Sequence, residues 1–490
     1  MEPLRPPESV PFRAPLPFDP SGFWKERRKQ ARATGPRSRL KGFFWQVLFL
    51  ALLGGSLGLP PLEARQPRAD NVLIVSLDTV RADHMGLYGY SRPTTSAIDA
   101  WSQRGVVFTS AVSHVPSTLP AHCTILTGLL PPEHGVRCNG LFRLPESVTT
   151  LAEILRKRGF ATGAIVGALP LDHRFGLAQG FVTYDDDFGT RILDAPRTPS
   201  TRPAPGVWLD HQYTAFERRA DEVTERALRW LQHRTSPWFL FVHYFDAHDP
   251  YEPDAPWSEQ FPLPYDGELA FVDHHLGRLL DRIRALEGRT LIVLTADHGE
   301  SLGEHGEATH NRFLYNATQW VPLVMVLEGV IPAGKRIDAP VCHADILPTV
   351  LSFLDLRPPR GLSGVSLRAP ILGDEPVPNR AIYAETMVWK LENLKGIEVR
   401  ALLFGPLKMI WTRTVAHGGA PDQWEAYEWR LDPHELDNVF SSEAVSHRIL
   451  SERLVKLSAR FETHAPQPEP VVLDSNRLKQ LRNLGYLGGK

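Results

Sequence analysis

Four short apolar runs, each ending in polar residues, constrain the fold of this chain most strongly. They are NVLIVSLDT (71–79), WFLFVHYFD (238–246), RTLIVLTADHGE (289–300) and VPLVMVLEG (321–329). Continuous apolar runs of this length are typical of strands that are buried on both faces. Stretches with apolar residues at three- and four-residue spacing lie among them, at 147–158, 217–232 and 268–286, and this spacing predicts helices. Strands alternating with helices favour an α/β fold with a parallel sheet.

The polar residues at the ends of these runs predict where a site lies. Ligands of such sheets bind beyond the carboxyl ends of the strands. Asp78, Asp246, Asp297 and His298 all stand at the expected strand ends. We therefore expect these side chains to converge at one edge of the sheet.

The length of 490 residues is too great for one small core. We predict a catalytic domain at residues 66–360 and a smaller β-containing subdomain at 361–490. Strand-like segments at 381–386 and 407–413 and a helix-like segment at 443–462 support the second unit. The net charge of -2 provides no global positive field, so we expect no nucleic-acid partner.

The N-terminus has the pattern of an export signal. A basic leader (1–42) precedes an apolar run at 43–59, FFWQVLFLALLGGSLGL. About 17 apolar residues are the lower limit for a membrane-spanning helix, and positive charge stays on the cytoplasmic side. We predict a signal-anchor with the N-terminus cytoplasmic and the catalytic domain periplasmic or extracellular. A cleaved signal peptide is the alternative.

Asp78, Asp297 and His298 offer ligands for a divalent metal. Carboxylate oxygens suit hard cations, and zinc or manganese also accepts imidazole. Mn, Zn, Mg and Ca all remain open, with one expected site and room for a second. A carboxylate at a strand end also caps helices, which is the alternative for Asp78 alone. Asp297-His298 within Asp-His-Gly-Glu is the more specific metal signal.

Thr118, within VPSTLPAHCTILTG, is a candidate nucleophile. A threonine hydroxyl attacks only when a metal or a base activates it. Ser117 or Thr118, with Pro120 in the first turn, also fits a helix start. Both interpretations can hold, because a helix N-terminus stabilises a phosphoryl anion. His122 would lie on the same helix face as Thr118.

Histidines gather in two further segments. His243, Asp246 and His248 lie close together before Tyr251, and this density of imidazoles and carboxylates favours a site. His310 follows His298 by twelve residues, across a glycine-rich loop that also contains His305. We expect one of His305 and His310 to return to the site.

These motifs together resemble the sulfatase branch of the alkaline phosphatase superfamily. The similar segments are NVLIVSLDTVRADHMGLYGY, STLPAHCTILTGLLPPEHGV, HYFDAHDPY, TADHGESLGEHG and HADILPTVL. The resemblance implies a central mixed sheet flanked by helices, with a smaller C-terminal subdomain, and the activity of an ester hydrolase.

The chain departs from the sulfatase pattern at three places. Thr118 occupies the position of the Cys or Ser that sulfatases convert to formylglycine, and threonine cannot form that aldehyde. GAIVGALPL (163–171) lacks the Lys and His of the family's Lys-x-His pair. Thr79 stands where many sulfatases have a second Asp.

A threonine nucleophile is similar to that of phosphate-handling relatives, and this resemblance implies the following roles. Asp78, Thr118, Asp297 and His298 would bind one metal. His248, His310 and Asp246 would bind substrate or a second metal. His122 replaces the sulfatase Arg and, like His310, would assist catalysis.

We expect a hydrolase or phosphotransferase acting on small-molecule, lipid or glycan phosphate esters. A sulfuric ester hydrolase without formylglycine is one alternative. A non-catalytic binding protein of the same fold is the other.

Overall fold

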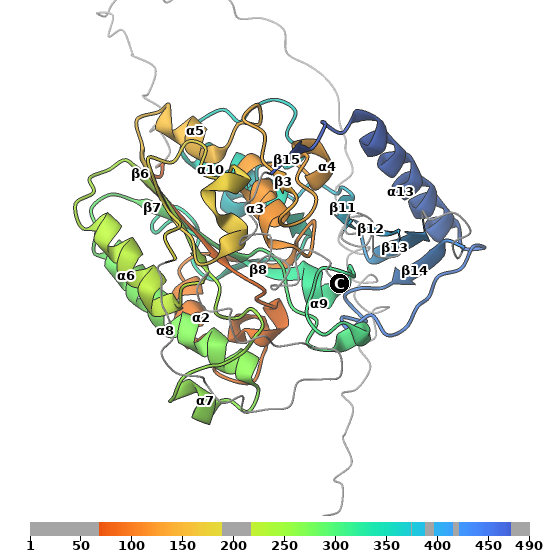
Figure 1. Cartoon of the computed structure of the whole chain (residues 1–490), viewed down its shortest axis with the longest axis horizontal. Helices are drawn as coiled ribbons and strands as arrows, with labels where there is room; N and C mark the ends of the chain where they lie inside the picture. Colours follow the sequence, from red (N-terminus) through yellow and green to blue (C-terminus); the bar gives the residue numbers. More distant parts are fainter. Residues whose placement is uncertain (1–67, 189–216, 374, 388–395, 415–420, 472–490) are drawn as a thin grey trace, which may run out of the picture. The chain divides into compact units, whose positions relative to one another are not determined.

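The computed structural model describes residues 68–188, 217–373, 375–387, 396–414 and 421–471 (Figure 1). All of them belong to one compact unit, residues 66–490. The predicted leader (1–42) and anchor (43–59) lie outside the described residues. Within the described ranges, no helix is both long and apolar enough to cross a bilayer.

A nine-stranded sheet forms the centre of the fold. Its strand order is β10-β2-β8-β7-β1-β6-β4-β5, and β9 pairs with β2 outside this path. The strands are β1 (Asn71–Leu77), β2 (Val106–Val112), β4 (Ala161–Ile165), β5 (Thr183–Asp185), β6 (Trp238–Tyr244), β7 (Thr290–Ala296), β8 (Trp320–Val326), β9 (Lys335–Ile337) and β10 (Val341–Cys342).

The sheet is mixed, as the resemblance implies. β1 runs parallel to its neighbours β6 and β7, whereas β8 is antiparallel to both β7 and β2. The connection from β7 to β8 contains only a 3-10 turn and the four-residue helix α9 (Asn316–Gln319). Because no long helix carries the chain back across the sheet, β8 starts at the edge where β7 ends and runs in the opposite direction.

Helices cover both faces of this sheet (Figure 1). On one side, α8 packs against both α6 and α2, and on the other α3 contacts α5 and α10. The predicted helices are present with shifted ends. The bounds are α2 (Ser96–Ser102), α3 (Thr118–Thr127), α5 (Leu151–Arg156), α6 (Ala220–Leu231), α8 (Pro264–Arg284) and α10 (Ile346–Phe353).

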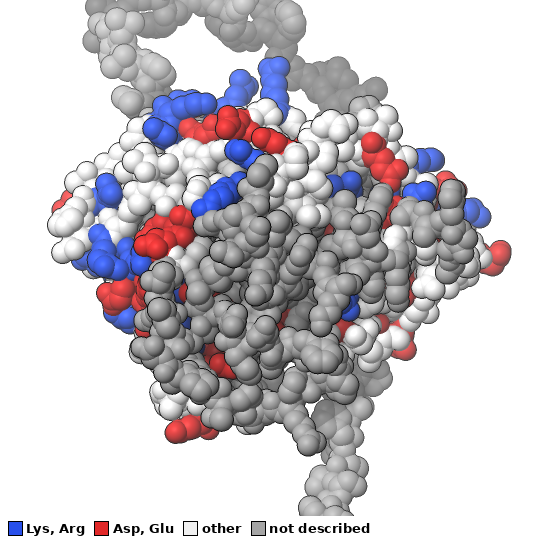
Figure 2. Space-filling model, viewed as in Figure 1, with Lys and Arg blue, Asp and Glu red and all other residues white. Residues whose placement is uncertain are grey.

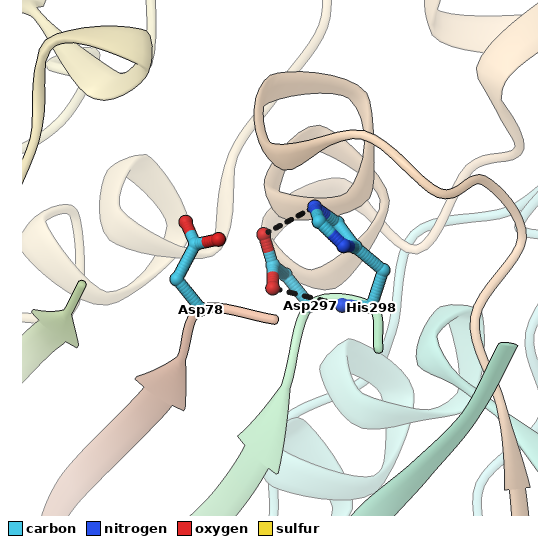
Figure 3. Close-up of side chains that lie close together, drawn as sticks. All are labelled: Asp78, Asp297 and His298. Atoms are coloured by element: carbon cyan, nitrogen blue, oxygen red, sulfur yellow. Dashed lines mark hydrogen bonds and ion pairs between the residues drawn. The ribbon is translucent and has the colours of Figure 1, made fainter. Parts of the chain in front are cut away.

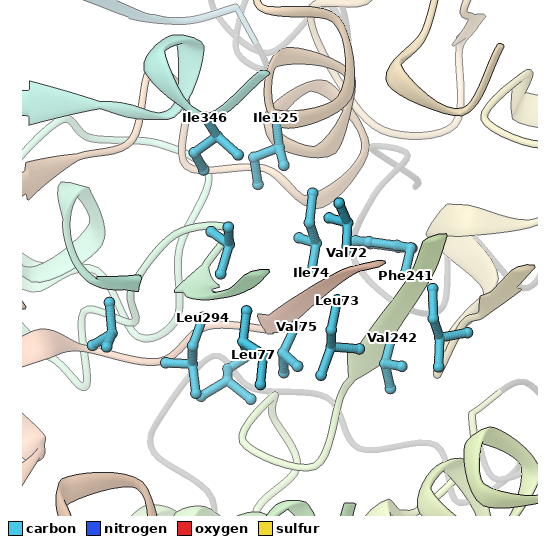
Figure 4. Close-up of a cluster of buried hydrophobic side chains, with 14 of the residues drawn as sticks. Val72, Leu73, Ile74, Val75, Leu77, Ile125, Phe241, Val242, Leu294 and Ile346 are labelled. Carbon is cyan, nitrogen blue, oxygen red and sulfur yellow. The ribbon is translucent and has the colours of Figure 1, made fainter. Parts of the chain in front are cut away.

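Strand β1 lies at the centre of the core, and all seven of its residues are buried. Side chains of successive strand residues point to opposite faces. Val72 and Ile74 therefore point toward Ile125 of α3, while Leu73, Val75 and Leu77 point to the other face (Figure 4). Apolar residues are needed on both faces, which explains the unbroken apolar run.

A separate antiparallel sheet follows, with the order β11-β12-β13-β14. Its strands are β11 (Ile382–Thr386), β12 (Ile397–Phe404), β13 (Leu407–Thr414) and β14 (Gln423–Tyr427). Helix α13 (Val445–His464) packs on β12 and β13. The predicted strand-like segments at 381–386 and 407–413 thus form β11 and β13, and the helix-like segment at 443–462 forms α13.

Asn316-Ala-Thr318 matches the sequence pattern of a glycosylation site, yet Asn316 has a structural role. The Asn316 side chain is buried, and its Nδ2 donates hydrogen bonds to the carbonyls of Trp429 and Pro433, both at 3.1 Å. Its amide therefore joins the β7–β8 connection to the loop that follows β14.

Charged side chains of both signs are mixed over the described surface in view (Figure 2).

Candidate metal and catalytic site

Asp78, Asp297 and His298 meet at the carboxyl ends of β1 and β7 (Figure 3). The two strands are parallel neighbours, so the residues that follow them lie side by side. One ligand atom from each residue can be chosen so that all three lie within 4.8 Å of one another. All three side chains are at most 1% exposed. The predicted strand-end residues of β1 and β7 therefore do come together.

Thr79, which follows β1, connects the end of this strand to the ends of β6 and β7. Its backbone N–H donates to Asp297 Oδ1 at 3.2 Å, and its hydroxyl donates to the carbonyl of Ala247 at 2.6 Å. Its φ of 56° lies in the left-handed region, which is costly for a β-branched residue. The three strand ends β1, β6 and β7 are linked through this one strained residue.

Hydrogen bonds fix which atoms of the cluster face inward. Asp297 Oδ1 accepts from the backbone N–H groups of Thr79 and His298, the latter at 2.8 Å. His298 Nδ1 donates to the carbonyl of Gly299 at 3.0 Å. The other ring nitrogen, Nε2, is therefore the atom that would bind a metal, as in metal-ligating histidines. Although burial lowers it, the pKa of His298 is raised overall by the charges of Asp297 and Asp78.

His243 orients Asp78. His243 Nδ1 accepts from the backbone N–H of Gly167 at 3.3 Å, so the proton resides on Nε2, which donates to Asp78 Oδ2 at 2.9 Å. Only Asp78 Oδ1 is left for a further ligand. Sequence reasoning placed His243 in a histidine-rich segment and gave it no role.

The cluster fits a divalent cation. Asp78 Oδ1 and Asp297 Oδ2 are buried without hydrogen-bond partners among the described residues, which is costly unless a cation pairs with them. His298 Nε2 lies 3.4 Å from Asp297 Oδ2 and adds a third potential ligand atom. Burial raises the pKa of Asp78 to about 7 despite the nearby His298, and burial together with Asp78 raises the pKa of Asp297. Two carboxylates and one imidazole are suitable ligands for several divalent metals.

Thr118 is the first residue of α3, and Ser117 is the N-cap. The Thr118 hydroxyl lies 3.5 Å from His298 Nε2, and the residue is fully buried. The N-terminus of α3 therefore stands at the cluster, where its dipole favours an anion. The predicted helix start is confirmed, whereas the role of Thr118 as a nucleophile stays a prediction.

His122 contacts the backbone of Thr118. Its Nδ1 donates to the Thr118 carbonyl at 2.6 Å, and its Nε2 lies 2.8 Å from Ser76 Oγ. The ring is fully buried and meets the His243 ring edge-on, with centroids 4.9 Å apart. These contacts fix α3 against β1, so the geometry favours a positioning role for His122.

His310 and His248 line the edge of the cluster. The ring of His310 lies 4.5 Å from that of His298, and the ring of His248 lies 5.0 Å from that of His310. His310 Nδ1 is 3.2 Å from Glu300 Oε1, and its buried Nε2 has no partner among the described residues. Of the two candidates on the glycine-rich loop, His310 is the one that reaches the site.

Asp246 faces a different group of residues. Its Oδ1 accepts from the backbone N–H of Ala220, at the start of α6, at 3.0 Å. Its negative charge acts to raise the pKa values of Arg219 and Glu268, which lie on the α6–α8 side of the sheet. Its predicted part in substrate or second-metal binding therefore gains no support from this position.

Comparisons with known proteins give the family. A family model described as sulfatase matches residues 70–356, which is more than half of the chain. The chain belongs to the sulfatase family. A second model, described as the C-terminal region of N-sulphoglucosamine sulphohydrolase, matches residues 303–460. Members of this family that resemble the chain are ester hydrolases.

Individual relatives are distant. An uncharacterized sulfatase of Escherichia coli K12, YidJ, is 23% identical over 433 residues, covering 75% of this chain and 82% of its own length. The phosphonate monoester hydrolase of Agrobacterium radiobacter superposes with a TM-score of 0.65 at 23% identity, covering 83% of this chain and 100% of its own. A protein solved with its substrate D-glucosamine-2-N,6-O-disulfate also gives 0.65, at 19% identity, covering 81% and 99%. These likenesses confirm the fold of a sulfatase-family hydrolase.

We expect the contribution of Asp78 to the stability of the metal-free protein to fall as pH rises from about 4 to about 7. The folded pKa of Asp78, about 7, lies above its ordinary 3.8. Its protonated form therefore stabilises the fold at low pH, and this contribution is lost as pH rises through 7. Urea unfolding at pH 5 and pH 8 with a chelator, compared between the unaltered protein and Asp78→Asn, measures how this contribution differs between the two pH values. A saturating divalent cation should reduce that difference, and a cation that leaves the pH 8 midpoint unchanged would argue against binding at Asp78.

We expect His243→Ala to weaken metal binding about 10- to 100-fold, the usual cost of losing a residue that orients a ligand. His243→Gln, which keeps an N–H donor toward Asp78, should lose less. Metal titration followed by calorimetry measures both affinities. Equal affinity in His243→Ala and the unaltered protein would show that Asp78 needs no such support.

Proposed function

We propose that this chain is a metal-dependent hydrolase or phosphotransferase of phosphate esters in which Thr118 is the nucleophile. The observation that carries this proposal is the position of the Thr118 hydroxyl. It lies at the start of α3, 3.5 Å from His298 Nε2, beside two carboxylate oxygens that have no hydrogen-bond partner in the described part of the chain. Asp78, Asp297 and His298, with Thr118, would hold the metal.

The reaction would begin with attack of the Thr118 oxygen on phosphorus. The hydroxyl releases its proton to water, the new phosphorus–oxygen bond forms, and the bond to the leaving group breaks, so that the departing alcoholate takes up a proton from water. The resulting phosphothreonine is resolved by water or by an acceptor alcohol. A bound divalent cation would lower the pKa of the hydroxyl and offset charge on the phosphoryl oxygens.

The histidines around the cluster would position the nucleophile, accept a proton and bind the substrate. His122, which donates to the Thr118 carbonyl, fixes the backbone of the nucleophile. His310 Nε2 has no partner within the described ranges and is suited to take the proton of the attacking water. Burial holds the pKa of His310 well below its ordinary value, which keeps the ring neutral. With His248, His310 would also contact phosphoryl oxygens or a second cation.

Hydrolysis of sulfuric esters is the second candidate. Similarity to several proteins named as sulfatases favours it. Thr118 argues against the formylglycine route, because threonine cannot be oxidised to that aldehyde. A sulfatase reaction here would need Thr118 itself to attack sulfur.

The apolar run at 43–59 supports an exported and membrane-anchored location for the protein. The proposed location is therefore periplasmic or extracellular, with the basic leader in the cytoplasm. A small-molecule, lipid or glycan ester would be the substrate.

Four substrates with a common leaving group test the activity. They are 4-nitrophenyl phosphate, bis(4-nitrophenyl) phosphate, 4-nitrophenyl phenylphosphonate and 4-nitrophenyl sulfate, each assayed with and without a chelator. Turnover of phosphorus esters that disappears on chelation is the expected result. Turnover of the sulfate alone would favour the second candidate, and turnover that resists chelation would contradict the metal assignment.

A further inference from the structure

The amino edge of the central sheet, where its parallel strands begin, lies opposite the metal cluster. β4, β6, β1 and β7 are side by side and run in one direction. The segments that precede these four strands therefore meet at one edge, whereas Asp78 and Asp297 follow their strands at the other. The seven residues of β1 separate the two edges by about 20 Å. The amino edge is thus outside the chemistry proposed above.

A cavity of about 870 Å³ opens at this amino edge. Its lining comes from residues 68–70 before β1, 158 and 160 before β4, 231–237 before β6 and 285–288 before β7. Most of these residues are exposed, including Gln232, Thr235 and Ser236. The volume is in the range of sites that hold small molecules, and the polar lining suits a polar or charged group.

Four arginines line the cavity without an ion-pair partner in the described part of the chain. They are all exposed, and they come from four separate segments: Arg68, Arg158, Arg234 and Arg282. The cavity also has two carboxylates, of which Asp70 already pairs with Arg289, at 3.6 Å between Oδ2 and Nε. Positive charge is therefore in excess at this edge.

Arginines elsewhere on the same helices are paired. Arg226 of α6 lies 2.9 Å from Glu222 Oε1, and Arg278 of α8 contacts Glu225. By contrast, Arg234 follows α6, and its guanidinium lies over the Trp230 ring, 4.6 Å from the centroid. This contact orients the guanidinium and leaves its charge uncompensated. The amino edge is thus suited to bind anions, and guanidinium groups bind phosphate oxygens with two parallel hydrogen bonds.

The described structure begins at the same edge. Arg68, the first described residue, lines the cavity. Only residues 60–67 separate it from the apolar run at 43–59, the predicted membrane anchor. A linker of this length spans about 30 Å even when it is fully extended. An anchored chain therefore keeps the amino edge within that distance of the bilayer surface.

We propose, on the basis of the membrane-anchored location proposed above, that the amino edge docks on anionic phospholipid headgroups. Each arginine close to an anionic membrane surface strengthens the attachment about fivefold. Docking through this edge directs the carboxyl edge, with the metal cluster, away from the bilayer. The ester substrate then reaches the cluster from the aqueous phase and not from the same membrane.

Energy transfer from the protein to labelled lipid headgroups tests this orientation on the full chain in lipid nanodiscs. A donor dye is placed at the amino edge by His233→Cys or at the carboxyl edge by Ala255→Cys. Both positions are exposed, whereas Cys123, Cys138 and Cys342 are buried. Discs of phosphatidylcholine alone are compared with discs that contain an equal part of phosphatidylglycerol.

We expect transfer from position 233 to be at least about twofold higher in the anionic discs. Transfer from position 255 should show no such increase. Raising NaCl from about 0.1 M to about 1 M shortens the Debye length from about 10 Å to about 3 Å and should remove the increase.

A triple variant, Arg158→Gln with Arg234→Gln and Arg282→Gln, should lose at least about half of the increase at position 233. A matched triple variant removes the same charge from exposed positions of α13, which packs on the separate sheet. Its substitutions are Arg448→Gln, Arg453→Gln and Lys456→Gln, and it should keep the increase. A thermal melt checks that both variants are folded.

Each further outcome overturns a different statement. Equal transfer in both kinds of disc, or a greater increase at position 255 than at 233, would overturn the docking while leaving the anchored location intact. An equal loss in the two triple variants would show that net charge acts without this edge, which also overturns it. A full chain that does not enter the discs would overturn both the location and the docking.

Discussion

Thr118→Ala is expected to lower kcat/KM for phosphate esters by at least about a thousandfold, as the loss of a nucleophile does in other hydrolases. The substitution removes the hydroxyl 3.5 Å from His298 Nε2. Alanine is a good helix former, and the N-cap of α3 is Ser117, so the start of the helix is kept. Initial-rate kinetics measure the loss, and circular dichroism with a thermal melt checks the fold.

Thr118→Ser is the matched control, because it keeps a hydroxyl at the same position. We expect it to retain activity within about tenfold of the unaltered protein. Ser117→Ala changes the N-cap of α3 and keeps the Thr118 hydroxyl, because the Ser117 hydroxyl contacts Asn311. It therefore tests whether a change at the helix start alone affects activity. Wild-type rates in Thr118→Ala would show that another group attacks the substrate.

Asp297→Asn is expected to abolish metal binding and to lower turnover about a thousandfold. Asp297 Oδ1 accepts from two backbone N–H groups, and Oδ2 faces His298 Nε2 without a hydrogen-bond donor. The Oδ1 of asparagine can keep both backbone hydrogen bonds. Its amide then points two N–H groups where the cation would bind, which converts an acceptor into a donor. Elemental analysis after dialysis and initial-rate kinetics measure the two effects.

Asp246→Asn is the control for Asp297→Asn, because Asp246 follows the neighbouring strand β6 and contacts α6. We expect it to keep its metal. Loss of metal in Asp246→Asn would restore the sequence-based expectation for this residue. Full metal content in Asp297→Asn would remove the cluster from consideration as the metal site.

The strand pattern of the sequence predicts the centre of the fold well. β1, β6, β7 and β8 are buried on both faces, so their residues are almost continuously apolar. β4 is harder to recognise, because its segment ATGAI contains a threonine and a glycine. Gly163 is required there, since a Cβ atom would lie 2.3 Å from the Trp230 ring. That requirement exists only once α6 is packed on the sheet.

The residues that the sequence predicted near the end of β6 do not all face the same side of the sheet. His243 points toward Asp78, whereas the next residue, Tyr244, meets Thr224 of α6 at 2.8 Å. Asp246, two residues beyond Tyr244, faces α6 as well. The two-residue period of β6 separates His243 from Tyr244, whereas Asp246 lies in the turn beyond the strand. Asp78, Thr118, Asp297 and His298 were predictable because each follows a strand or begins a helix at the same edge of the sheet.

The roles of His122 and His243 depend on hydrogen bonds that no sequence pattern encodes. His122 spans from the Thr118 carbonyl to Ser76 of β1, 46 residues away in sequence. His243 depends on the Gly167 N–H, 76 residues away. Such contacts are set by the packing of α3 and β4 against the central strands.

Trapping the covalent intermediate tests the central claim most directly. The full chain would be mixed with bis(4-nitrophenyl) phosphate, quenched in acid within milliseconds, and examined by intact and peptide mass spectrometry. We predict a phosphoryl adduct on the peptide that contains Thr118, absent from Thr118→Ala and from chelator-treated protein. Turnover without any adduct on Thr118, or an adduct that persists in Thr118→Ala, would contradict the proposed mechanism.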